Sequence, residues 1–341
     1  MRLKRVRLTD GTTSTAVWHA EQWLPLTPVL AVADPALVGV GDDLIACLSG
    51  GALVQTRLSA ALTAVAPRHT ALAALVTNES LLPFAPRSFR DFMLWERHVV
   101  EASRGLFRRF APQIYAGLAA EEARTGELPP QLRPKPLWYK RPIYYMGNHL
   151  SFYPDGATIP WPSYTQALDY ELELGVIIAH AVASPSPEEA LATIGGFVLV
   201  NDWSARDVQV PEMTEAQFGP VKAKHFASSM GAEVVTPDEV LPFVDELAAH
   251  VWVNGELWGT GSTTGMHHGL AAMVAYAALG EQLVPGELLA TGTIPGCCGV
   301  ELDRWVAPDD VVTLELAHVG RLTNRVGAQD GPSGRVADSQ G

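Results

Sequence analysis

Residues 167–178 read Ala-Leu-Asp-Tyr-Glu-Leu-Glu-Leu-Gly-Val-Ile-Ile, an alternation of apolar and acidic side chains that predicts a β-strand. On such a strand Asp169, Glu171 and Glu173 point to one face and the apolar residues between them point to the other. Neighbouring carboxylates on one face repel each other unless a positive charge lies between them, and a divalent cation is the usual partner. A solvated edge strand is the alternative interpretation of the same pattern.

Two further segments bring acidic side chains that fit the same kind of site. Residues 195–200 read Gly-Gly-Phe-Val-Leu-Val, which predicts a buried strand that delivers Asp202 at its C-terminal end. Residues 88–98 read Ser-Phe-Arg-Asp-Phe-Met-Leu-Trp-Glu-Arg-His, and we expect a helix that carries Asp91 and His98 two turns apart on one face. Carboxylate oxygens without a cysteine ligand favour Mg²⁺, Mn²⁺ or Ca²⁺ over Zn²⁺.

These segments, in this order, resemble the fumarylacetoacetate hydrolase family from about residue 81 to residue 326. The family's Arg-Asp-Phe, Glu-x-Glu and Asn-Asp-Trp-Ser-Ala-Arg-Asp motifs bind a divalent metal, and its late Gly-Thr loop resembles residues 291–296. The resemblance implies a mixed β-roll within a β-rich α+β fold, a homodimer, and Mg²⁺, Mn²⁺ or Ca²⁺ as cofactor. It also implies that the metal ligands are Asp91, Glu171, Glu173 and Asp202.

The resemblance assigns the catalytic groups as well. His98 would act as the general base, and Lys224 and Gln209 would donate hydrogen bonds to developing oxyanion charge. A carboxylate should orient His98 and stabilise its protonated form. Glu301 matches the family's glutamate across a gap, whereas Glu101 lies three residues from His98 on the same predicted helix. Of these two, we expect Glu301.

Substrate contacts follow from the same comparison of motifs. We expect Tyr145 and Thr293 to contact the substrate, and Arg108, or Arg104 on the same predicted helix, to bind a substrate carboxylate. Two positions depart from the family's tyrosines and hold Met93 and Met213 instead. Methionines make a less polar pocket, which favours a bulkier or less charged substrate.

The chemistry that these groups support is cleavage of a C–C bond in a 1,3-diketone or acylpyruvate-type substrate. A divalent cation stabilises an enolate, and a neutral His98 takes a proton from the attacking water. A 2-oxo acid decarboxylase, tautomerase or isomerase would use the same metal–enolate site and is the alternative. A third hypothesis, a non-catalytic scaffold, is disfavoured because a scaffold needs neither the metal ligands nor His98.

Length and composition set the remaining expectations. The 341 residues suit a small N-terminal α/β module over 1–80, a catalytic domain over 81–326 and a flexible C-terminal tail over 327–341. The net charge of −13 argues against nucleic acid or an anionic membrane as partner and leaves a small oxo acid or diketone. Three cysteines, with no recognisable signal peptide or membrane span, favour a reducing cytoplasm.

Overall fold

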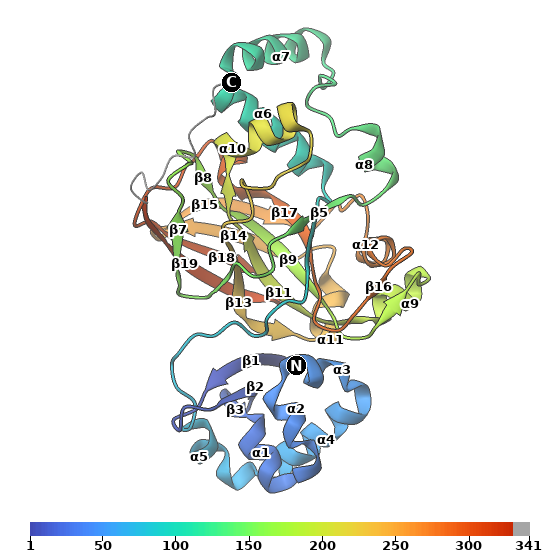
Figure 1. The fold of residues 1–341 in the computed structure, drawn as a ribbon, viewed down its shortest axis with the longest axis vertical. Helices are drawn as coiled ribbons and strands as arrows, with labels where there is room; N and C mark the ends of the chain where they lie inside the picture. Colours follow the sequence, from blue (N-terminus) through green and yellow to red (C-terminus); the bar gives the residue numbers. More distant parts are fainter. Residues whose placement is uncertain (330–341) are drawn as a thin grey trace, which may run out of the picture.

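The computed structural model describes residues 1–329, which form a β-rich α+β fold around two main sheets (Figure 1). The larger sheet has ten strands in the order β3-β2-β1-β13-β11-β9-β17-β4-β5, with β6 beside β13. Its strands are β1 (Arg2–Arg7), β2 (Thr13–His19), β3 (Gln22–Pro25), β4 (Phe89–Phe92), β5 (Tyr144–Gly147), β6 (Phe152–Pro154), β9 (Glu171–Ile178), β11 (Ile194–Asp202), β13 (Ser228–Val235) and β17 (Leu288–Cys298). The fold class expected from the sequence is confirmed.

The second sheet has five strands and packs against the first through the main hydrophobic core. Its order is β15 (Glu256–Ser262), β14 (Ala248–Val253), β18 (Val311–Leu316), β19 (Gly320–Gln329) and β7 (Thr158–Trp161). Leu172 and Leu174 of β9 share this core with Val251 of β14 and Leu314 of β18. The predicted alternation of residues 167–178 is therefore real, because the apolar side chains between the acidic ones fill the space between the sheets. Two short pairs complete the strands: β8 (Leu168–Asp169) with β12 (Ser204–Ala205), and β10 (Val182–Ala183) with β16 (Gln282–Leu283).

The N-terminal residues add both strands and helices to this framework. Their helices are α1 (Leu26–Ala33), α2 (Val38–Asp42), α3 (Leu44–Ser49), α4 (Gly51–Ala64) and α5 (His69–Ala73), with the 3₁₀ turns η1 (Pro35–Leu37) and η2 (Ala66–Arg68). Strand β1 pairs with β13, and Leu3 and Leu48 share a second core with Val198 of β11. The N-terminal strands thus extend the large sheet, and a module that folds independently over 1–80 stays a prediction.

Several helices gather at the opposite end of the molecule from the N-terminal strands (Figure 1). These are α6 (Glu96–Phe110), α7 (Pro112–Thr125), α8 (Pro136–Lys140), α10 (Arg206–Pro211) with the π-helical turn η3 (Glu212–Ala216), and α13 (Gly299–Leu302). The remaining helices are α9 (Pro187–Ala192), α11 (Pro237–Val240), η4 (Leu241–Phe243) and α12 (Leu270–Ala277). No helix within residues 1–329 is long and apolar enough to cross a membrane.

Two local expectations are corrected by the structure. Asp91 lies on strand β4, and helix α6 begins only at Glu96, so Asp91 and His98 do not share a helical face. Asp91 pairs with Ala290 on one side and Tyr145 on the other, so long-range sheet pairing overrides the local pattern. At the C-terminus, β19 continues to Gln329, past the expected boundary at 327, and the rest of the predicted tail, 330–341, lies outside the described residues.

Candidate metal centre and active site

A cavity of about 590 Å³ opens where helix α6 crosses the end of strands β9, β4 and β5. Its wall includes eight residues that the sequence analysis assigned to the site: Asp91, His98, Tyr145, Glu171, Glu173, Gln209, Lys224 and Thr293. Asp202 and Glu301 lie just behind this wall and contact residues that form it. Segments far apart in the sequence therefore meet at one place, as the predicted site requires.

The four predicted metal ligands come from three strands of the large sheet. Glu171 and Glu173 begin β9, Asp202 ends the neighbouring β11, and Asp91 lies on β4, with only β17 between β4 and β9. All four side chains are buried, with at most 3% of any of these residues exposed. Buried carboxylates that share one site need counter-charge, because isolated ionised groups are costly away from water.

Two of the four carboxylates lack that counter-charge. Both Oε atoms of Glu173 and Oδ1 of Asp91 are buried and find no hydrogen-bond partner among the described residues. Burial, together with the nearby carboxylates, raises the pKa of Glu173 and of Asp91 well above the usual range. Unpartnered, buried carboxylate oxygens are what a hard divalent cation would satisfy, so the residues present fit a metal of this kind.

The other two carboxylates are already held by cations of the chain. The ammonium of Lys224 bridges them, contacting Glu171 and lying 2.7 Å from Oδ2 of Asp202. Arg206 adds a contact of 2.7 Å from Nη2 to Oε1 of Glu171. Burial opposes ionisation, but Arg206 and Lys224 together lower the pKa of Glu171. Although burial acts against it, Asp202 and Glu171 raise the pKa of Lys224, which keeps its charge.

The carboxylates are consequently less tightly gathered than a loaded metal site. Among residues 1–329, the one group of three metal-ligating side chains with all ligand atoms within 4.8 Å of one another is His98, Cys298 and Glu301. The acidic set is spread by Lys224, which lies between Glu171 and Asp202. The convergence of the four carboxylates on one cation therefore stays a prediction.

His98 and Glu301 form a buried pair beside these carboxylates. Nδ1 of His98, on α6, lies 2.5 Å from Oε1 of Glu301, on α13. Oε2 of Glu301 accepts the backbone N–H of Gly296 at 2.7 Å, which fixes the carboxylate. The alternative partner, Glu101, is turned toward Arg104, with 3.5 Å between Oε1 and Nε. With Nδ1 directed at Glu301, Nε2 is the nitrogen of His98 that is left for the cavity.

Three other predicted residues line the cavity in defined orientations. The hydroxyl of Tyr145 donates to Oδ2 of Asp202 at 2.6 Å. Oε1 of Gln209 accepts from Nη1 of Arg206 at 2.9 Å, so the amide NH₂ of Gln209 is the group left to donate to a ligand. Thr293 is the β17 neighbour of Glu173 in the sheet register.

The predicted substrate contact of Arg108 is not supported by its position. Arg108 is not part of the cavity wall, and its Nη1 lies 3.6 Å from Oδ2 of Asp303. The alternative, Arg104, forms a two-bond pair with Glu122 at 2.7 Å for each bond. Both arginines follow His98 on α6 by more than one turn and pair with acids that do not line the cavity, so a contact of either with a substrate carboxylate stays a prediction.

Sequence reasoning missed the role of Asp169 and Arg206 in building the site. Nε of Arg206 donates to Oδ2 of Asp169 at 2.8 Å. The same carboxylate accepts the backbone N–H groups of Gly299 and Val300 at 2.7 and 3.0 Å. Asp169 therefore ties the turn that carries Glu301 to the β9 side of the cavity. The available signal was that Asp169 shares a strand face with Glu171 and that Arg206 follows Asp202 within one motif.

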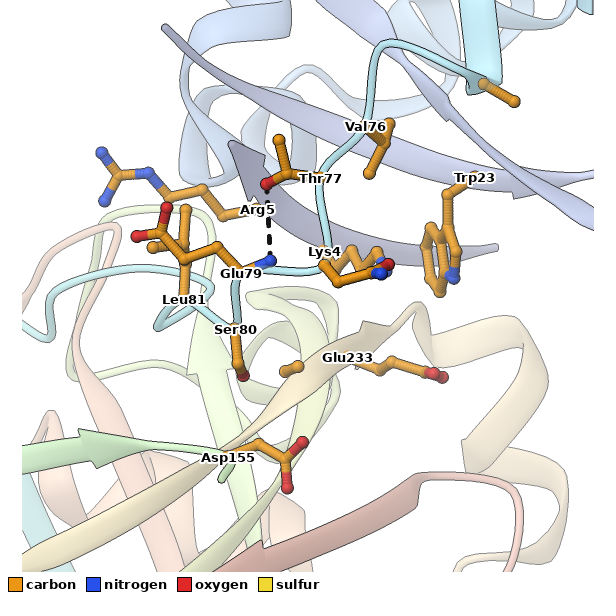
Figure 2. A pocket seen from close by; sticks show the side chains of 13 residues that line it. Lys4, Arg5, Trp23, Val76, Thr77, Glu79, Ser80, Leu81, Asp155 and Glu233 are labelled. Carbon is orange, nitrogen blue, oxygen red and sulfur yellow. Dashed lines mark hydrogen bonds between the residues drawn. The ribbon is translucent and has the colours of Figure 1, made fainter. Parts of the chain in front are cut away.

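A second cavity, of about 450 Å³, lies where the N-terminal strands meet β13 (Figure 2). Lys4, Trp23 and Glu233 line it from these strands, and the Lys4 ammonium lies 4.4 Å from the Trp23 ring centroid. Its acidic groups already have partners in the chain: Glu233 pairs with Arg2 at 2.9 Å, and Glu79 pairs with Arg7 at 3.1 Å. None of the predicted site residues lies there, so the cavity beneath α6 is the candidate active site.

Comparison with known proteins places this arrangement in context. A family model described as Fumarylacetoacetate (FAA) hydrolase C-terminal matches residues 114–327. Among curated proteins, mitochondrial oxaloacetate tautomerase FAHD1 of Homo sapiens is 31% identical over 155 residues, which is 46% of this chain and 70% of that protein. The 2,4-didehydro-3-deoxy-L-rhamnonate hydrolase of Sphingomonas sp. (strain SKA58) is 40% identical over 160 residues, which is 46% of this chain and 55% of that protein.

A solved structure shows the same fold along almost the whole chain. Maleylpyruvate hydrolase from Sphingobium sp. SYK-6, in complex with manganese(II) and pyruvate, superposes with a TM-score of 0.63 at 18% identity. The match covers 97% of this chain and 100% of that chain. At this level of identity the likeness speaks for the fold, including its N-terminal strands and helices.

Proposed function

We propose, since this chain belongs to the fumarylacetoacetate hydrolase family, that it is a divalent-metal-dependent hydrolase which cleaves a C–C bond in a 1,3-diketone or acylpyruvate-type substrate. The observation that carries this proposal is the buried pair of His98 and Glu301, whose imidazole lines the same cavity as the unpartnered carboxylate oxygens of Asp91 and Glu173. A positioned base beside a cation site is the minimum that metal-assisted addition of water to a carbonyl requires.

Asp91, Glu171, Glu173 and Asp202 would hold the cation, with Mg²⁺, Mn²⁺ or Ca²⁺ as candidates. When bound, such a cation polarises the substrate carbonyl and favours the enolate over the free carbanion. The presence of manganese(II) and pyruvate in a maleylpyruvate hydrolase of the same fold supports both the metal and a 2-oxo acid ligand. The ammonium of Lys224, which lies between Glu171 and Asp202, would reduce the repulsion among the four carboxylates.

His98 would take the proton from water, and Glu301 would hold the imidazole so that Nε2 accepts it. The resulting hydroxide adds to the carbonyl remote from the carboxylate of the substrate. The C–C bond then breaks, its electron pair passes into the enolate of the 2-oxo acid product, and the carbon is reprotonated. The amide of Gln209 and the ammonium of Lys224 line the cavity as donors for oxygen atoms that gain charge.

A second candidate function uses the same residues without addition of water. The human relative is named an oxaloacetate tautomerase, and an Escherichia coli relative is named a bifunctional isomerase/decarboxylase. Both reactions move a proton or lose carbon dioxide through an enolate of a 2-oxo acid. His98 would then transfer a proton to or from carbon instead of activating water.

The deciding experiment is an assay of acylpyruvates, fumarylpyruvate and oxaloacetate with Mg²⁺ or Mn²⁺, with the products identified directly. We expect a carboxylic acid and a 2-oxo acid in equal amounts from the acylpyruvates, and loss of activity with a chelator. Turnover of oxaloacetate alone, without hydrolysis of any diketone, would replace the hydrolase by the second candidate. A homodimer and a cytoplasmic location stay predictions.

A further inference from the structure

The candidate active-site cavity has a charged inner end and an apolar outer wall. The inner end holds the carboxylates, Lys224, Arg206 and His98. On the outer wall, helix α6 contributes Val99, Ala102 and Leu106 at the i, i+3 and i+7 positions that share one helical face. Ala102 and Leu106 also pack against the cluster that contains Val300. Met93, Ile143 and Met213 continue this wall on other segments. A substrate bound by its polar head at the inner end would therefore lay its far end against hydrocarbon and thioether groups.

Among residues 1–329, the arginine and lysine side chains that line the cavity are Arg206 and Lys224, and both are paired with acids of the chain. Lys224 bridges Glu171 and Asp202, and Arg206 binds Asp169 and Glu171. Each has its charge matched at the inner end. A second carboxylate on the substrate would lie against the apolar outer wall without a positive partner, and removing an ionised carboxylate from water in this way costs free energy.

Besides His98, the imidazole of His225 lines the cavity. Nε2 of His225 lies 2.9 Å from the carbonyl oxygen of Met146, so that nitrogen carries a proton and is used within the chain. The His225 ring lies parallel to Tyr145, with 6.5 Å between the ring centroids and 20° between the planes. The ring is therefore held between the Met146 carbonyl and Tyr145, on segments other than α6.

We infer that the substrate is a 2-oxo acid whose far end is apolar, an aryl or alkyl group, rather than a dicarboxylic acid such as fumarylpyruvate. This inference rests on the proposed function, because it takes the 2-oxo acid head to lie at the carboxylate end. A volume of about 590 Å³ exceeds what a three- or four-carbon acid needs and lies within the range of pockets that enclose larger ligands. Val99, Ala102 and Leu106 are then the residues that set specificity.

The test compares two ligands that share a head and differ only in the charge of the tail. These are 2-oxo-4-phenylbutanoate and its para-carboxylated derivative, neither of which has a second carbonyl to be hydrolysed. Binding to the Mn²⁺-loaded 341-residue chain is measured by calorimetry. We expect the ligand with the uncharged tail to bind at least about tenfold more tightly. This factor is the scale of the cost of leaving one carboxylate unpaired against an apolar wall.

A matched pair of variants locates the effect. Ser103 lines the cavity on the same face of α6, between Ala102 and Leu106. Ser103→Arg should lower the preference for the uncharged tail by about tenfold, because the arginine supplies a cation that can pair with the tail carboxylate. Ser103→Gln has a long polar side chain without a charge and should leave the preference unchanged. If Ser103→Arg does not fold, Leu106→Lys one turn further on serves the same purpose.

The outcomes separate this inference from the proposed function. Binding of neither ligand by the metal-loaded protein overturns the proposed function and the inference with it. Equal or tighter binding of the para-carboxylated ligand overturns the inference alone. The protein would then bind the 2-oxo acid head but would not prefer an uncharged tail. If Ser103→Arg and Leu106→Lys both leave the preference for the uncharged tail as it is in the wild type, that result overturns the assignment of this helical face as the specificity surface.

Discussion

Nδ1 of His98 and Oε1 of Glu301 lie 2.5 Å apart although 203 residues separate them in the sequence. Each side is fixed independently: His98 is in the first turn of α6, and Glu301 is tied to the backbone of Gly296. The pair leaves one imidazole nitrogen facing a cavity that contains unpartnered carboxylates. If His98 is the base, as we propose, this contact fixes which ring nitrogen accepts the proton, and mutagenesis should test that role first.

Replacement of either member of the pair should reduce turnover while leaving metal binding intact. His98→Ala removes the base, and Glu301→Gln keeps the shape but loses the charge that orients it. We expect each to lower kcat by about 10²–10⁴-fold in the acylpyruvate assay, the usual contribution of a positioned base. Glu101→Gln is the matched control, because Glu101 lies on the same helix and faces Arg104. A loss of kcat in Glu101→Gln as large as in Glu301→Gln would contradict the pairing.

The raised pKa of Glu173 and Asp91 predicts how metal binding depends on pH. A carboxyl pKa that is higher in the folded chain contributes stability below the unfolded value of about 4, and this contribution is lost as pH rises through the folded value. A divalent cation competes with the retained protons. The gain in melting temperature on adding Mg²⁺ should therefore increase between about pH 5 and about pH 8.

Glu173→Gln is the variant that checks the origin of this pH effect. It removes one of the buried, unpartnered carboxylates, so the Mg²⁺-dependent gain in melting temperature should be small and nearly flat with pH. The metal-free variant should be as stable as the metal-free wild type or more so, because a buried amide needs neither a retained proton nor a counter-charge. A wild-type response to Mg²⁺ in Glu173→Gln would show that Glu173 is not a ligand.

The strands that carry the carboxylates could be predicted because their signal is local. The alternation in residues 167–178 and the apolar run before Asp202 correspond to β9 and β11. The same holds for the Asn254-Gly255 hairpin turn, where both residues have positive φ, and for the capping box of Ser186 and Glu189 that starts α9. In each case neighbouring residues alone determine the backbone.

The misplaced features depend on contacts that the local sequence does not contain. Asp91 is in a strand because β17 and β5 pair with β4 on both sides, although its spacing from His98 suggested a helix. Arg108 was proposed by analogy with the family; it pairs with Asp303, a contact that its sequence position alone does not predict, and its role toward a substrate stays a prediction.

Lys224 should be essential for the stability of the metal-free protein, because its ammonium bridges two buried carboxylates. Lys224→Met would leave Glu171 and Asp202 without that charge, at a cost of about 3–5 kcal/mol in the free energy of unfolding. The control is Lys222→Met, two residues away: Lys222 is exposed, its ammonium lies 5.7 Å from the Tyr164 ring centroid, and its loss should change stability by about 0.5 kcal/mol or less. Urea unfolding without metal measures both. Equal stability of the two variants would remove Lys224 from its role as counter-ion.

Gly105 is the position where the packing of α6 against the Glu301 turn can be tested without touching a catalytic group. It lies two turns after His98, and a Cβ added there would fall 1.9 Å from the carbonyl oxygen of Val300, the residue before Glu301. Gly105→Ala must therefore push α6 away from α13 and separate His98 from Glu301. We expect kcat to fall more than metal affinity, with a loss of about 1–3 kcal/mol in the free energy of unfolding.

The matched substitution for Gly105→Ala is Gly117→Ala on the neighbouring helix α7, where an added Cβ meets no atom within 4 Å. Alanine favours a helix over glycine, so Gly117→Ala should keep wild-type kcat and gain up to about 1 kcal/mol in the free energy of unfolding. The contrast isolates steric separation of the pair from the general effect of adding a methyl group to a helix. A Gly105→Ala protein with wild-type kcat would mean that the close approach of α6 to Val300 does not set the position of His98 for catalysis.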